Sequence, residues 1–256
     1  MDILDFFAIT HDPHTFCNPI SAAAIDELIE FFRLPHGGRV VDVACGKAEL
    51  LVRTLRRWSS TGVGVDVNPF FVEAARRNVE QADLAASAEI VEGNGAEFTA
   101  AGPFDLASCV GASWIWGGHA GALEALSGFA RPGGLILAGE PFWRREPSPE
   151  HLAATGLTAS SFAATHLDNV ETGLRQGLRL IHAIVATEHD WDHYHGQQWA
   201  AVDRYARENP DDPDSSELVA KMAELQDQYL RWGREEIGWA MYLFRKSPLP
   251  SDAETA

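Results

Sequence analysis

Short apolar runs alternate along this chain with longer stretches in which apolar residues recur every three or four positions. The short runs are bounded by glycine, proline or asparagine and are typical of buried strands. They cover Arg39 to Val43, Gly62 to Val67, Ala88 to Glu92, Phe104 to Val110 and Leu135 to Gly139. Strands that alternate with helices predict an α/β fold with a doubly wound, mostly parallel sheet and right-handed crossovers.

The helical stretches lie before and between these strands. They cover Ser21 to Phe32, Leu50 to Trp58, Pro69 to about Gln81 and Ala120 to Phe129. Proline suits a helix start because its missing N–H would be unpaired there anyway. The sequence from Arg131 to Gly134, Arg-Pro-Gly-Gly, predicts a turn that closes the last of these helices.

The C-terminal part departs from this alternation. Leu178 to Thr187 and Gly238 to Arg245 are two further strand candidates, and the pattern between them is mostly helical. A hairpin needs only a short connection, so we expect a helical insertion with a role of its own. Pro141 to about Thr165 is a second long segment, directly after the fifth strand. The last ten residues have the composition of a disordered tail.

Composition excludes several classes of function. A chain of 256 residues fits one α/β domain with insertions, or at most two small domains. The formal net charge of -17 repels phosphate backbones, so we expect no nucleic-acid partner. We find neither a leader sequence nor an apolar run of membrane-spanning length, and we expect a cytoplasmic protein. The three cysteines are widely spaced, which favours neither disulfides nor a metal site.

The most informative stretch runs from Val40 to Leu51. It reads as a buried strand, a tight turn of small residues and an amphipathic helix, and a second strand follows that ends in the acid Asp66. This order of elements builds a pocket for a nucleoside-bearing cofactor at the carboxyl edge of a parallel sheet. Only Gly46 is a glycine in the turn, so the glycine-rich fingerprint of dinucleotide-binding proteins is missing.

The stretch Val40 to Leu51 resembles the first motif of class I S-adenosylmethionine (SAM) methyltransferases, hydrophobic-hydrophobic-Asp-x-Gly-Cys-Gly-x-Gly. Ala44 and Ala48 stand where the family usually has glycine. The resemblance covers about residues 35 to 140. The rest of the chain resembles the family only in the order of its strands and helices. It implies SAM as cofactor and a seven-stranded sheet whose last strand is antiparallel. We therefore expect a single domain with four parts: residues 1–34, an N-terminal helical segment; 35–187, the cofactor-binding core; 188–237, a helical insertion or lid; and 238–246, the final strand.

The resemblance also implies roles for single residues. Asp42 resembles the acid that orients the loop and the cofactor's ammonium group, and Asp66 the acid that accepts both ribose hydroxyls. Asn94 stands where the family has an aspartate for the adenine amino group. Alone, either acid also fits a capping role, and Asn94 also fits a plain Asn-Gly turn. The expected cofactor residues are Asp42, Ala44, Cys45, Gly46, Asp66, Val67, Asn94, Gly95, Ala96, Cys109 and Gly111.

Methyl transfer requires close approach, alignment and, for some nucleophiles, a base. The N-terminal segment, the loops after the fourth and fifth strands, and the insertion are rich in aromatic and polar residues. A pocket lined by such aromatic and polar residues suits a small acceptor that is planar, heteroaromatic or an amine. The substrate-binding candidates are Phe16, Asn18, Trp114, Trp116, Trp143 and Asp192, and the candidate catalytic residues are Glu140, His119 and His14. Packing is the alternative for each tryptophan, loop hydrogen bonding is the alternative for Glu140, and a surface or structural position is the alternative for His119 and His14.

The sequence thus predicts a SAM-dependent methyltransferase, a monomer or homodimer that acts on a small molecule. Two alternatives stay open. The first is a SAM-binding regulatory module without catalysis, and the second is a nucleotide-cofactor oxidoreductase.

Overall fold

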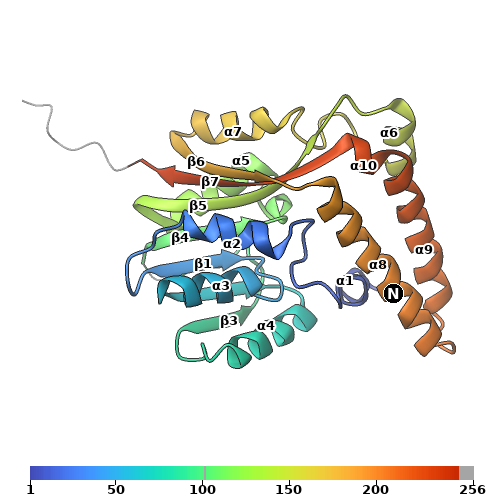
Figure 1. Cartoon of the computed structure of the whole chain (residues 1–256), viewed down its shortest axis with the longest axis horizontal. Helices are drawn as coiled ribbons and strands as arrows, with labels where there is room; N and C mark the ends of the chain where they lie inside the picture. Colours follow the sequence, from blue (N-terminus) through green and yellow to red (C-terminus); the bar gives the residue numbers. More distant parts are fainter. Residues whose placement is uncertain (101, 248–256) are drawn as a thin grey trace, which may run out of the picture. The chain divides into compact units, whose positions relative to one another are not determined.

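The computed structural model describes residues 1–100 and 102–247 (Figure 1). The chain forms two compact units, which we describe separately. Unit 1 comprises Met1–Ala22, Pro141–His166 and Val185–Trp239, and unit 2 comprises Ala23–Glu140, Leu167–Ile184 and the chain from Ala240 onward. The predicted division into one domain with four parts stays a prediction. Apart from its first residue, the tail predicted to be disordered lies outside the described residues.

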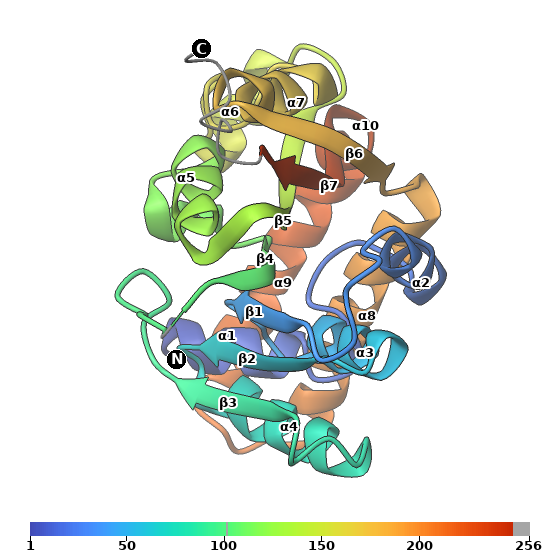
Figure 2. The same cartoon turned by 90° about the vertical axis from the view of Figure 1, so that its left-hand side faces the viewer.

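Unit 2 is built on the sheet, and a few residues at the ends of three strands belong to unit 1. The strands of the described residues are β1 (Arg39–Val43), β2 (Thr61–Asp66), β3 (Ala88–Glu92), β4 (Phe104–Val110), β5 (Ala130–Trp143), β6 (Leu178–Val185) and β7 (Ile237–Lys246). Their order is β3-β2-β1-β4-β5-β7-β6, and Figure 2 shows them in succession from β3 to β6. The first five strands pair in parallel, and the last strand is antiparallel. This confirms the predicted fold class.

The helices of unit 2 connect these strands. They are α2 (Ala22–Glu30), α3 (Glu49–Trp58), α4 (Pro69–Gln81), the 3-10 helix η1 (Ser113–Trp116), α5 (His119–Phe129) and α7 (His166–Arg175). The apolar stripe of α3 packs on β2, where a Cβ atom on Gly62 would lie 2.8 Å from Leu51 and 3.3 Å from Leu55. Helix α4 begins with Pro69, as predicted, and Asn68 caps it by accepting a hydrogen bond from the N–H of Phe70.

Unit 1 is mostly helical. Its helices are α1 (Ile3–Thr10), α6 (Pro149–Thr155), α8 (Glu188–Glu208), α9 (Ser215–Gln228), the π-helix η2 (Tyr229–Gly233) and α10 (Arg234–Glu236). Val202 of α8 packs with Leu218 and Met222 of α9 in an apolar cluster. Helices therefore fill the segment in which the sequence predicted a helical insertion. None of the helices formed by the described residues combines the length and apolar composition that a membrane span requires.

Several element boundaries differ from the sequence prediction. β6 ends at Val185 instead of Thr187, because Thr187 caps α8 in a reciprocal hydrogen-bonded box with Asp190. The expected turn at Arg131 to Gly134 lies inside β5, which begins at Ala130 and pairs with β4 through an irregular register. Helix α1 lies within residues 1–34, the predicted N-terminal helical segment, in which the sequence predicted helix bounds only for Ser21 to Phe32.

Candidate active site

The loop after β1 has a left-handed backbone. The φ angles of Ala44, Gly46 and Ala48 are 57°, 54° and 61°. Left-handed conformations cost an L-residue about 1–2 kcal/mol and glycine almost nothing, which explains why the family favours glycine at these positions. Ala44 and Ala48 thus adopt the left-handed conformation that glycine adopts at the lowest cost, although they depart from the sequence of the motif.

Asp66, at the end of β2, holds this loop in place. Its Oδ2 atom accepts a hydrogen bond of 2.8 Å from the N–H of Gly46, and its Oδ1 atom accepts one of 2.9 Å from the N–H of Asn68. Burial raises the pKa of Asp66, and the backbone N–H groups of Asn68 and Gly46 oppose that rise. The backbone N–H of Val67 opposes the rise as well, so three N–H groups favour the charged form of Asp66, which accepts hydrogen bonds from hydroxyls most strongly.

Asp42, in β1, is a buried carboxylate in a mostly apolar setting. Its Oδ1 atom accepts a hydrogen bond of 2.7 Å from the Ser108 hydroxyl, and its side chain is only 3% exposed. Burial raises the pKa of Asp42 to about 7, although the bond from Ser108 lowers it. A cationic group bound nearby would favour the charged form, so an ammonium group suits this position. Sequence reasoning missed Ser108, whose only signal was a hydroxyl within an apolar strand.

The loops after β1, β3 and β4 meet at Gly95. A Cβ atom there would lie 2.5 Å from the Val43 side chain and 3.2 Å from Ile115, so a larger residue would push the loops apart. The Asn94 side chain accepts a hydrogen bond of 3.0 Å from the N–H of Ala96. This is the turn that formed the alternative to an adenine contact. Val67, directly after Asp66, is 52% exposed.

The exit from β4 leads to an exposed aromatic side chain. Cys109 is buried, and burial raises the pKa of its thiol, as expected of a packing residue rather than a nucleophile. Gly111 has a φ angle of 80° and precedes η1. Trp114 in η1 is 73% exposed, whereas Trp116 is half-buried. Trp114 thus presents a large apolar surface in the turn that follows β4 in unit 2.

Two of the three predicted bases lie next to each other in unit 2. The Nδ1 atom of His119 lies 3.6 Å from the Oε1 atom of Glu140. Glu140 also accepts a hydrogen bond of 2.9 Å from the Ser113 hydroxyl through Oε2. The structure therefore joins two residues that the sequence proposed separately, and adds Ser113, which the sequence analysis did not single out.

The third predicted base, His14, lies in unit 1. It lines a cavity of about 280 Å³ together with Phe16 and Asn18, two of the predicted substrate residues. His14 is 3% exposed, and its Nε2 atom donates a hydrogen bond of 2.9 Å to the carbonyl oxygen of Tyr194. His189 and His193 of α8 complete the polar wall of this cavity.

The remaining two predicted substrate residues are held by contacts within unit 1. Trp143 is 2% exposed, and its indole N–H donates a hydrogen bond of 3.0 Å to the carbonyl oxygen of Ala159. Asp192 accepts a hydrogen bond of 2.7 Å from the Tyr229 hydroxyl and pairs with Arg234 at 2.9 Å, and these bonds lower its pKa. Burial and the indole hydrogen bond match the packing alternative for Trp143, and the bonds of Asp192 hold its carboxylate within unit 1.

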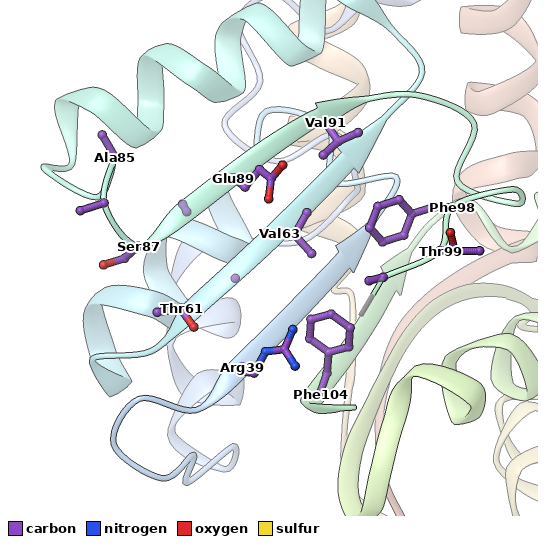
Figure 3. A pocket seen from close by; sticks show the side chains of 14 residues that line it. Arg39, Thr61, Val63, Ala85, Ser87, Glu89, Val91, Phe98, Thr99 and Phe104 are labelled. Carbon is purple, nitrogen blue, oxygen red and sulfur yellow. The ribbon is translucent and has the colours of Figure 1, made fainter. Parts of the chain in front are cut away.

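Unit 2 contains a cavity of about 560 Å³ that extends along β3 and β2 and reaches the amino ends of β1 and β4 (Figure 3). Arg39, Thr61 and Phe104, the first residues of β1, β2 and β4, line it, and Phe98 forms part of its wall. It contains none of the predicted site residues. Within residues 1–100 and 102–247, histidine, cysteine and acidic side chains form no group of three or more that could hold a metal ion.

Comparisons with known proteins agree with this geometry. A family model described as a methyltransferase domain matches residues 40–134. The chain is 32% identical over 243 residues to the uncharacterized protein YjhP of Escherichia coli (strain K12), with 94% of this chain and 98% of the relative covered.

Two solved structures are similar over nearly their whole length. A SAM-dependent methyltransferase from Geobacter sulfurreducens in complex with S-adenosyl-L-homocysteine has a TM-score of 0.89 and 30% identity, over 95% of this chain and 98% of that one. A SAM-dependent methyltransferase from Thiobacillus denitrificans in the same complex has a TM-score of 0.88 and 32% identity, over 95% and 99%. The fold, the cofactor loop and these relatives together show that the chain belongs to the class I SAM-dependent methyltransferases.

Proposed function

We propose that this methyltransferase acts on a small-molecule acceptor that is planar, heteroaromatic or amine-bearing. For the acceptor, the observation that carries the proposal is the exposed Trp114 after β4. For the cofactor, it is the carboxyl edge of unit 2, where Asp66 accepts the N–H of Gly46 and so fixes the loop after β1. The nearby buried Asp42 and the left-handed loop fit a ligand with an ammonium group and a ribose. The relatives crystallised with S-adenosyl-L-homocysteine support this interpretation.

When bound, SAM supplies an electrophilic methyl group on a sulfonium sulfur. The chain's own residues then have to bind the cofactor and the acceptor, align their reacting atoms and exclude water from the site. We propose that Asp42 binds the ammonium group, Asp66 the ribose hydroxyls and Asn94 the adenine. The other residues proposed to line the cofactor are Ala44, Cys45, Gly46, Val67, Gly95, Ala96, Cys109 and Gly111.

For the acceptor, the best-supported contact is Trp114, because 73% of its side chain is exposed to a ligand. An indole face of this kind stacks on planar rings and attracts cationic amines. The other acceptor-binding residues in the proposal are Phe16, Asn18, Trp116, Trp143 and Asp192, and the proposed bases are Glu140, His119 and His14. We further propose a cytoplasmic monomer or homodimer without a nucleic-acid partner, in keeping with the formal net charge of -17.

A turnover assay tests the proposal. The protein is incubated with SAM and a panel of small phenols, thiols, amines, pyridines and thioethers, and release of S-adenosylhomocysteine is measured. We expect turnover with at least one planar or amine acceptor, and loss of that turnover in Asp66→Ala. If SAM binds but no acceptor is methylated, the alternative of a SAM-binding regulatory module replaces the proposal.

A further inference from the structure

Two buried polar atoms face each other where β5 ends and α5 begins. They are Oε1 of Glu140 and Nδ1 of His119, 3.6 Å apart, and neither has a hydrogen-bond partner among the residues that the structure describes. Both side chains are more than nine-tenths buried. An unsatisfied buried polar atom costs about 1–3 kcal/mol, so a pair of them calls for a reason.

The hydrogen bonds of the ring fix its tautomer. The Nε2 atom of His119 lies 3.1 Å from the carbonyl oxygen of Asn169, which can only accept, so Nε2 carries the hydrogen. In a neutral imidazole Nδ1 then has only a lone pair, and it faces Oε1 of Glu140, which in the carboxylate form also has only lone pairs. One added proton turns these two acceptors into a donor and an acceptor. The pair is therefore arranged to take up a single proton.

The surrounding groups leave Glu140 as the acceptor of that proton. Tyr242 of β7 lies beside His119, with ring centroids 5.7 Å apart, and Cys109 of β4 lies within electrostatic range of Glu140. Burial, with a further contribution from the Glu140 charge, raises the pKa of both groups, so both stay neutral. No lysine or arginine of the described residues pairs with Glu140.

Ser113 connects this pair to the exposed turn η1. Its hydroxyl donates to the Oε2 atom of Glu140 at 2.9 Å, and the next residue is the exposed Trp114. The lone pairs of the Ser113 oxygen stay available to accept a hydrogen bond. A proton given to Ser113 thus has a direct route to Glu140.

We propose that Glu140 and His119 form the proton acceptor of the methyl transfer, that the Ser113 hydroxyl passes the proton to them, and that the methyl acceptor is therefore a protic nucleophile: a hydroxyl, a thiol or an N–H amine. This rests on the proposed function. The acceptor's lone pair forms the new bond to the methyl carbon while the carbon–sulfur bond breaks, and that electron pair goes to sulfur. The acceptor's proton moves to the Ser113 oxygen as the Ser113 proton moves to Glu140. A half-turn of the carboxyl group then lets the new O–H donate to Nδ1 of His119.

The first test follows the proton itself and needs neither cofactor nor acceptor. NMR of the full-length protein with labelled histidine and glutamate follows the ring nitrogens of His119 and the carboxyl carbon of Glu140 as the pH is lowered. We expect one shared transition. In Glu140→Gln the pH response of the His119 ring nitrogens should differ from that of the wild type, because the carboxyl group that shares the proton with Nδ1 is gone.

Glu236→Gln, which alters a separate histidine–glutamate pair in unit 1, is the matched control and should leave the His119 transition unchanged. Glu140→Asp provides a second variant in case Glu140→Gln does not fold. Independent transitions of the two groups, or an unchanged His119 transition in Glu140→Gln, would overturn the proposal and leave the proposed function intact.

The second test uses turnover with matched probes: phenol, thiophenol and aniline as protic acceptors, pyridine and dimethyl sulfide as aprotic ones. We expect turnover with a protic probe, with kcat reduced by about 100-fold or more in Glu140→Gln and about 10-fold in Ser113→Ala. The affinity for S-adenosylhomocysteine should stay within about twofold, and the acid limb of the pH–rate profile should disappear in Glu140→Gln. Turnover confined to aprotic probes, or an unaltered kcat in Glu140→Gln, contradicts the proposal. Failure to bind S-adenosylhomocysteine at all would instead refute the proposed function.

Discussion

Two buried histidine–glutamate pairs, one in each unit, use the same chemistry in opposite ways. In unit 1, His151 and Glu236 are 2.7 Å apart, and Glu236 also accepts a hydrogen bond of 3.1 Å from the N–H of Ser148. The His151 ring stacks on Trp232, with centroids 5.7 Å apart. In unit 2, His119 and Glu140 are 3.6 Å apart and keep two unsatisfied atoms. In the first pair the facing polar atoms are hydrogen-bonded to each other, and in the second pair the facing atoms can still accept a proton.

The hydrogen bonds of the pair in unit 1 also change the pKa of its glutamate. Burial alone would raise the pKa of Glu236, but the hydrogen bonds from His151 and Ser148 lower it below its usual range. A group held in this way stabilises the fold and is a poor base. We therefore assign Glu236 a structural role in unit 1 and propose the chemical role for Glu140.

The largest expected effect is a difference between the two pairs in how much each stabilises the fold. Glu236→Ala leaves His151 without its partner in a buried site and should lower the free energy of unfolding by about 3–5 kcal/mol. Glu140→Gln should lower it by less than about 1 kcal/mol, because Glu140 has only one hydrogen bond to lose. Urea unfolding followed by circular dichroism measures both. Equal losses in the two variants would show that both pairs are structural.

The next prediction tests whether a carboxylate that already accepts several hydrogen bonds within the protein must have a structural role. Asp66 accepts two backbone hydrogen bonds, yet we expect Asp66→Ala to weaken S-adenosylhomocysteine binding by about 1.5–3 kcal/mol, roughly 10- to 150-fold. The control is Asp105→Ala, at the amino end of β4, where Asp105 accepts from the N–H of Arg39 and pairs with Arg131. It should leave the affinity unchanged. The same affinity in both variants would remove Asp66 from the cofactor site.

Asp42 extends the comparison to an acid with few partners. Its pKa of about 7 should fall when an ammonium group binds, so cofactor binding below pH 7 releases a proton. The affinity for S-adenosylhomocysteine should therefore rise about tenfold from pH 6 to pH 8. Calorimetry across this range measures it, and Asp42→Asn should remove the dependence. An affinity that does not vary with pH in the wild type would show that Asp42 makes no charged contact with the cofactor.

The smallest expected effect concerns the backbone of the left-handed loop after β1. Ala44→Gly relieves a left-handed alanine and should raise the free energy of unfolding by about 0.5–1 kcal/mol. Ala220→Gly, on an exposed face of α9, should lower it by a similar amount, because glycine is unfavourable in a helix. Thermal or urea unfolding distinguishes the two. A loss of stability in Ala44→Gly would mean that the methyl group of Ala44 contributes more than the strain costs.

What the sequence predicted was mostly local. The strand, turn and helix from β1 to α3 and the acid at the end of β2 follow from residues that are near each other in the chain. Glu140 and His119 were recognised singly as candidate bases, but their pairing depends on how α5 packs beside β5, which no local pattern indicates. His151 and Glu236 are separated by 85 positions, and the sequence gives no signal that joins them.

The left-handed loop shows a different limit. Ala44 and Ala48 looked like departures from the family motif, because a residue type indicates a backbone conformation only as a preference. The φ angles show that both alanines adopt the left-handed conformation that glycine favours. Trp143 was proposed from its place after a strand, and its buried position beside Phe162 depends on contacts with a distant segment.

Calorimetry of the wild-type protein with S-adenosylhomocysteine, and with NAD as the competing cofactor, tests the central claim most directly. If the edge formed by Asp42, the left-handed loop and Asp66 binds the cofactor, S-adenosylhomocysteine should bind with micromolar affinity and NAD should not bind. If S-adenosylhomocysteine does not bind even at millimolar concentration, the edge of unit 2 does not hold this cofactor and our account of the site is wrong.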